Sequence, residues 1–124
     1  MGKVEDVKEI LEQLEKRASD IVGTAVIRTN GLVVTSAFPD ETNERMIAAM
    51  SAALLGTSKR TAEALYNGNF KSLNLELDQG NMFLISAGPV ILVAITTQEP
   101  NVGLLTLEME ESSKKIRKIF EEVD

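Results

Sequence analysis

One segment of the chain is apolar at every position, and this segment constrains the fold more than any other. Residues 90–95 read Val-Ile-Leu-Val-Ala-Ile, with no alternation between apolar and polar positions. Successive side chains of a strand point to opposite faces, so a strand of this kind must be covered on both faces. The run is far shorter than the roughly 20 apolar residues that span a bilayer. We therefore predict a central strand and no insertion into a membrane.

A second kind of strand is predicted over residues 71–78, where apolar and polar residues alternate strictly. The apolar face carries Leu73, Leu75 and Leu77, and the polar face carries Asn74, Glu76 and Asp78. One wet face is common in antiparallel sheets, and it favours a place at the sheet edge. The two kinds of strand together predict an α/β sandwich, with helices on both faces of one mainly antiparallel sheet.

Turn residues mark the ends of the other predicted strands. Residues 21–29 and 32–38 are rich in β-branched residues, and Asn30-Gly31 lies between them. Asn-Gly suits a type I′ turn, which needs positive φ at both central residues, so we predict a β-hairpin that Pro39 ends. Two more strands are predicted at residues 82–87 and 90–97, joined at Gly88-Pro89.

Three segments predict helices. Residues 3–18 carry apolar residues at spacings of three and four, and a similar stripe runs from residue 101 or 102 to Val123. The middle helix is predicted from Asp40, as its N-cap, to about Tyr66. The predicted order is α-β-β-α-β-β-β-α, in a single domain over residues 1–124.

The middle helix has small residues where a solvated helix face would carry charges. A strip of its surface is formed by Ala49, Ala52, Ala53, Leu55 and Gly56. Small side chains let another helix approach closely. The alternative explanation for the alanines is that alanine is the best helix former. Because Gly56 weakens a helix, we favour a second buried face and predict a contact with a second copy of the chain.

Composition excludes several classes of function. The 124 residues include 13 Lys and Arg against 19 Asp and Glu, which gives a net charge of −6, and they include no His and no Cys. An acidic domain without a basic run is a poor candidate for binding nucleic acid, and disulfides and thiolate or imidazole metal sites are excluded. The first residues show no signal-peptide pattern, so we expect a cytoplasmic protein.

Catalytic motifs are also missing. Gly56-Thr-Ser-Lys-Arg60 lacks the glycine spacing of a phosphate-binding loop, and it lies within the middle helix. Ser112-Ser-Lys-Lys115 matches S-x-x-K without the accompanying motifs of the serine acylases. We therefore expect no catalytic residues, no cofactor and no metal, and we expect that the protein is not an enzyme.

Two segments carry a family resemblance. Ala25-Val-Ile-Arg-Thr-Asn-Gly-Leu-Val-Val34 is similar to the hairpin of the roadblock family, and Asn101-Val-Gly-Leu-Leu-Thr-Leu107 is similar to the segment that opens its last helix. The chain resembles this family from about Val4 to Glu122. The family includes dynein light chains, late-endosomal scaffold subunits and bacterial or archaeal regulators of Ras-like GTPases. An acidic residue common in its hairpin is replaced here by Thr29 or Asn30, and a basic residue by Thr106.

The resemblance implies a five-stranded antiparallel sheet, with the middle helix on one face and the terminal helices on the other. It also implies dimers joined through the middle helices and the third strands. The expected interface therefore comprises Ala49, Ala52, Ala53, Leu55 and Gly56 together with Leu73, Asn74, Leu75, Glu76, Leu77 and Asp78. Family members that accelerate GTP hydrolysis are understood to remodel the GTPase's own site, so no arginine finger is expected.

The function that follows is a non-enzymatic, homodimeric adaptor or regulator of a small Ras-like GTPase. Four residues of the middle helix are the expected contacts with the partner: Arg45, Lys59, Arg60 and Tyr66. Two alternatives remain open at this point. One is a scaffold subunit of the dynein-light-chain kind, and the other is a ligand-binding sensor domain of similar shape, which needs a cavity with convergent polar groups.

Overall fold

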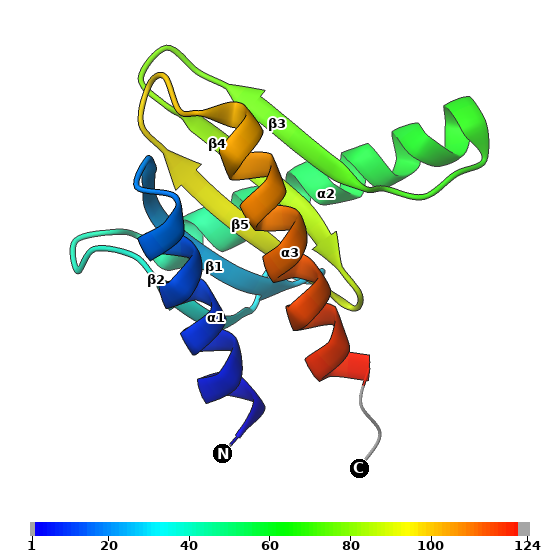
Figure 1. The fold of residues 1–124 in the computed structure, drawn as a ribbon. Helices are drawn as coiled ribbons and strands as arrows, with labels where there is room; N and C mark the ends of the chain where they lie inside the picture. The colour runs from blue at the N-terminus through cyan, green and yellow to red at the C-terminus, as the bar shows by residue number, and fades with distance from the viewer. Residues whose placement is uncertain (1, 122–124) are drawn as a thin grey trace.

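The computed structural model describes residues 2–121 of the chain. Its elements follow the predicted order (Figure 1). They are α1 (Lys3–Arg17), β1 (Ile21–Arg28), β2 (Val33–Ala37), α2 (Glu44–Tyr66), β3 (Ser72–Glu76), β4 (Asn81–Ala87), β5 (Val90–Thr96) and α3 (Val102–Glu121). Glu122 and Val123, to which the resemblance and the last helix were predicted to extend, lie outside the described residues.

The five strands form one antiparallel sheet in the order β2-β1-β5-β4-β3. β5 lies between β1 and β4, and Val90 to Ala94 are all buried. The predicted central strand is thus confirmed. β3 is the last strand of the sheet, which confirms its predicted place at an edge.

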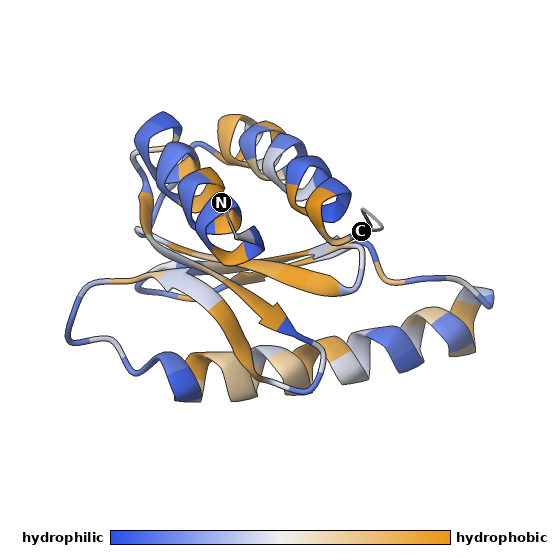
Figure 2. Ribbon diagram, turned by 90° about the horizontal axis from the view of Figure 1, so that it is seen from below, coloured by the Kyte–Doolittle hydropathy of each residue, from blue (hydrophilic) through white to orange (hydrophobic). Residues whose placement is uncertain are grey.

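The sheet separates two layers of helix, as the resemblance implies. α1 and α3 cover one face and α2 covers the other (Figure 2). Burial of apolar side chains drives both contacts. Val7, Leu11 and Leu105 belong to the core under α1 and α3, whereas Ile47 and Leu55 belong to the core over α2. None of the helices within residues 2–121 is long and apolar enough to cross a membrane.

Two local predictions were wrong in detail. The predicted hairpin is present, but its loop comprises residues 29–32, and Gly31 alone takes a positive φ, of 89°. The Arg28 N–H donates to the Leu32 carbonyl at 2.8 Å, so the chain closes a longer turn than the type I′ turn expected. α2 begins later than predicted, because residues 39–42 form a turn, and the Asn43 side chain, not Asp40, accepts from the Met46 N–H at 3.1 Å.

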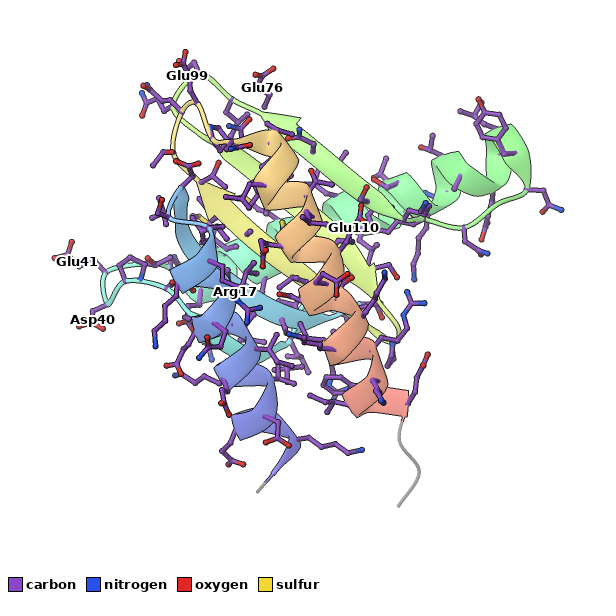
Figure 3. The ribbon with its side chains drawn as sticks, viewed as in Figure 1. Arg17, Asp40, Glu41, Glu76, Glu99 and Glu110 are labelled. Atoms are coloured by element: carbon purple, nitrogen blue, oxygen red, sulfur yellow. The ribbon has the colours of Figure 1, made fainter. Side chains whose placement is uncertain are left out.

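Polar contacts tie α1 to the sheet and to α3. Thr24 of β1 is fully buried, and its hydroxyl donates to Glu15 of α1 at 2.6 Å. Partial burial of the Glu15 carboxyl raises its pKa, although the hydrogen bond from Thr24 opposes this effect. Arg17 of α1, labelled in Figure 3, approaches Glu108 of α3 to 3.9 Å.

Candidate interaction surface

The described residues show no cluster of three or more His, Cys, Asp or Glu side chains that is placed to hold a metal. A groove of about 410 Å³ lies between α1 and α3. Charged side chains of both signs line it, including Asp6, Glu9, Lys115 and Lys118. The features that stand out are instead an incompletely covered helix and an incompletely paired strand.

α2 is longer than the sheet that it covers, and its last turns extend beyond the sheet (Figures 1 and 2). Leu65 follows Ile47 by about five helical turns, and Tyr66 follows Leu55 by about three. The two later residues therefore project on the same side as the two buried ones. Leu65 is nevertheless 67% exposed and Tyr66 84% exposed, because no part of their own sheet lies beside them. The apolar side of α2 that packs against the sheet therefore extends beyond the end of the sheet.

β3 presents an edge near this overhang. Its backbone pairs with β4 on one side only within the described structure. Leu73 and Leu75 pack into the core on the α2 side, so Ser72, Asn74 and Glu76 point to the face that carries α3. The strand ends at Glu76, and Leu77 and Asp78 belong to the following turn, in which the Leu77 N–H donates to the Gly80 carbonyl. The predicted alternation is confirmed, but the strand is three residues shorter than expected, one at its start and two at its end.

The small-residue strip of α2 differs from the sequence expectation. Leu55 is 1% exposed and packs against the sheet, so placing it on an exposed strip was wrong. Ala52 faces the hairpin of the same chain: a Cβ atom on Gly31 would lie 3.5 Å from the Ala52 Cβ atom and 3.8 Å from the Ala49 Cα atom. Close approach by this hairpin therefore explains part of the strip. Ala53 is exposed, and a Cβ atom on Gly56 would meet only Arg60.

Larger apolar residues lie on the other side of α2, toward the β3 edge. Leu54 projects about 160° away from both Ala52 and Gly56 around the helix axis. Because Ala52 faces the β1–β2 hairpin, Leu54 points toward the opposite half of the sheet, and it packs against the same core as Leu73 and Leu75. Met50, one turn before Leu54, is 48% exposed. Met50, Leu54, Thr61 and Leu65 fall at helical spacings along this side of α2, but spacing alone does not say which side a second chain would meet.

The structure does not bring all the predicted partner-binding residues together. Arg45 lies in the first turn of α2, and Lys59 lies about 21 Å further along its axis. Lys59 and Arg60 are neighbours near the overhang that ends at Tyr66, and all four side chains are exposed. Lys59 also lines a groove of about 340 Å³, with Glu63 and Asn69, beneath the end of the sheet.

The comparisons with known proteins agree with this fold. A family model described as the Roadblock/LC7 domain matches residues 7–96. The uncharacterized protein MJ1340 of Methanocaldococcus jannaschii is 30% identical over 114 residues, which cover 92% of this chain and 99% of that protein. Among solved structures, the gliding protein MglB of Thermus thermophilus has a TM-score of 0.90 at 18% identity, covering 99% of this chain and 94% of that one. Myxococcus xanthus MglB gives 0.90 at 20%, covering 98% and 92%.

Proposed function

Since the chain belongs to the Roadblock/LC7 family, we propose that it is a non-enzymatic, homodimeric adaptor that regulates a small Ras-like GTPase. The GTPase class comes from the roadblock resemblance of the hairpin and of the start of α3. The dimer and its surface are argued from the structure of this chain.

The overhang of α2 is the observation that carries the proposal. A monomer leaves Leu65 and Tyr66 in water beside a strand edge that has no partner strand within residues 2–121. Exposed edges invite pairing with another chain, and exposed apolar patches mark interfaces. A second copy that pairs its β3 with this β3 would continue the sheet past the edge. The overhanging turns of α2 would then lie against the sheet of the second copy.

The same geometry selects one side of α2 for the contact between helices. In a sheet continued through β3, the side that faces the second copy is the side of Met50 and Leu54. Ala52 points the other way, toward the hairpin, and Gly56 follows it by one turn on the same side of the helix. We therefore assign the helix contact to Met50, Leu54, Thr61 and Leu65 in place of the small-residue strip. Ala53 and Arg60 remain on the outer surface, and the exposed Lys59 side chain lies beside it at the groove below the end of the sheet.

This outer surface is the proposed contact with the GTPase. Arg45, Lys59 and Arg60 are exposed cations on an acidic protein, and complementary charge mainly speeds encounter and fixes orientation. The regulator would act by reshaping the GTPase's own site, with these side chains in a binding role.

The oligomeric state tests the first half of the proposal. Sedimentation of the purified chain at micromolar concentration should give a species of twice the 13.5 kDa chain mass. A single 13.5 kDa species would refute the dimer.

Pull-down from the native lysate tests the second half, with and without a non-hydrolysable GTP analogue. Preferential recovery of a small GTPase with the analogue supports the regulator. Recovery of partners that ignore the nucleotide would replace it with the scaffold, and a co-purifying small molecule would replace it with the sensor.

Single-turnover hydrolysis by a recovered GTPase then tests the mechanism. We expect acceleration, and the maximal rate should survive Arg45→Ala and Arg60→Ala, with weaker binding as the only loss. A fall of the maximal rate by about 10³-fold in either variant is what removal of an arginine finger produces. That result would refute the remodelling mechanism while leaving the GTPase as the partner.

A further inference from the structure

The two ends of β3 carry opposite charge. Glu76 ends the strand and Asp78 follows it in the turn, and both are exposed. Figure 3 shows Glu76 at one extremity of the molecule, directed into solvent. No cation approaches either carboxylate within 4.0 Å in the part of the chain that the structure describes, where the ion pairs are Arg17–Glu108 and Lys114–Glu111.

The other end of β3 borders a groove of about 350 Å³ beside α3. Three cations line it, Lys71 before the strand and Lys114 and Arg117 on α3, together with the Ser72 side of β3. Glu110 also lines the groove, so the cations exceed the carboxylates by two. Lys114 is already within 3.7 Å of Glu111 on its own helix, which leaves Lys71 and Arg117 as the main uncompensated charges.

Antiparallel pairing of β3 with a second β3 would join these two ends. If residues 72–76 of both copies overlap fully, Ser72 lies opposite the second copy's Glu76, and Asn74 lies opposite its own equivalent. Directly opposite residues of antiparallel strands point to the same face, with Cβ atoms about 5 Å apart. Glu76 and Ser72 both point to the α3 face, so the second copy's Glu76 carboxylate would enter the cationic groove.

The apolar face of the strand supports the same register. Full overlap sets Leu73 of one copy opposite Leu75 of the other, twice, on the α2 side. A slip of one residue would set leucines against polar residues and turn the second copy's α2 to the wrong face. A slip of two residues would still set leucine opposite leucine, so the apolar pattern excludes only odd slips, and the match of Glu76 with the cationic groove selects full overlap.

We propose that the dimer is locked in this register by the Glu76 side chain of each copy, seated in the groove of Lys71, Lys114 and Arg117 of the other. The inference rests on the proposed dimer and adds its alignment and its charged contacts. Two-fold symmetry repeats the contact, so both grooves are filled when two copies meet.

Charge reversal at either end tests the lock. Glu76→Lys sets two lysines against two cationic grooves. The double variant Lys71→Glu/Arg117→Glu makes both grooves acidic, so it sets the two Glu76 carboxylates against acidic grooves. Each variant alone should raise the dimer dissociation constant by about tenfold or more at low ionic strength, where exposed charges are least screened. Glu99→Lys is the matched control, because Glu99 lies at the same end of the molecule as Glu76 but outside β3 (Figure 3). It should leave the constant unchanged.

Mixing the two reversed proteins gives the decisive result. In a mixed dimer every contact joins opposite charges, so the mixture should form heterodimers more tightly than either variant forms homodimers. Sedimentation measures the homodimer and heterodimer dissociation constants, with one variant fused to a mass tag so that the two kinds of dimer differ in mass. A wild-type monomer would refute the dimer and the lock together. A wild-type dimer that Glu76→Lys leaves intact, or a mixture without preference for heterodimers, would refute the lock alone.

Discussion

Met50→Glu should dissociate the proposed dimer without unfolding the chain. Met50 is 48% exposed in the single chain, and burying a whole methionine side chain contributes about 1.5–3 kcal/mol. Covering the exposed half therefore contributes about 1 kcal/mol per copy, or about 2 kcal/mol per dimer. Losing this amount weakens the dimer about thirtyfold. A desolvated carboxylate from each copy would weaken it further.

Gly56→Glu is the matched control, because it adds the same side chain about 120° around the helix axis from Met50, at a position where a Cβ atom would meet only Arg60. Its effect on dimerisation should be small. Sedimentation over a concentration series measures both constants, and circular dichroism verifies that both variants fold. Dissociation by Gly56→Glu, with Met50→Glu still dimeric, would place the contact on the small-residue strip and refute the assignment to the Leu54 side.

Three further predictions concern the fold. Leu55→Ala should cost about 2–5 kcal/mol of unfolding free energy in urea at fixed protein concentration, because a fully buried leucine leaves a cavity between α2 and the sheet; a cost below about 1 kcal/mol would mean that Leu55 is not a core residue. Asn101→Ala should cost about 1 kcal/mol in thermal unfolding, since the Asn101 side chain accepts from the Leu104 N–H at 3.1 Å and caps α3; an unchanged melting temperature would contradict this. The raised pKa of Glu15 favours its protonated form in the folded state, so its contribution to stability is complete below the ordinary value of 4.5 and is lost as the pH rises through the raised pKa. Glu15→Gln should remove this fall in stability on raising the pH, and an identical pH profile of unfolding would contradict it.

The two helix layers, the central place of β5 and the edge place of β3 were accessible from the sequence because each rests on a short-range pattern. The unbroken apolar run of Val90–Ile95 required cover on both faces, and the alternation around Leu73 and Leu75 required one wet face. Both are properties of single strands. The structure then had few ways to arrange such strands with three helices.

The local errors arose where two residues compete for one role. Asp40 and Asn43 both suit an N-cap, and the turn begun by Pro39 leaves the role to Asn43. Asn30-Gly31 suits a two-residue turn, but the pairing of Ile27 with Val33 encloses a longer loop, in which only Gly31 needs a positive φ. Propensity indicates which residues can take a role, and the register of the neighbouring strands decides which one does.

The interaction surface was harder to predict for a related reason. Alanine at positions 48, 49 and 52 was compatible with a second helix, with helix propensity and with close approach of another loop. The structure shows the third, since Gly31 of the hairpin lies against this part of α2. The relevant contact is between segments of one chain that are about twenty residues apart, and a helical periodicity carries no information on it.

The length of α2 nevertheless indicates a contact with a second copy, which helical periodicity does not indicate. Its 23 residues extend about 35 Å, whereas the outer strands of a five-stranded sheet lie about 19 Å apart. A helix that crosses such a sheet is too long for it, so the apolar residues of its last turns, Leu65 and Tyr66, cannot all be buried by the same chain. Joining two sheets through β3 would give ten strands spanning about 43 Å. The mismatch between the helix and its own sheet is then resolved by a second copy, and the charges at the two ends of β3 would decide how that copy is aligned.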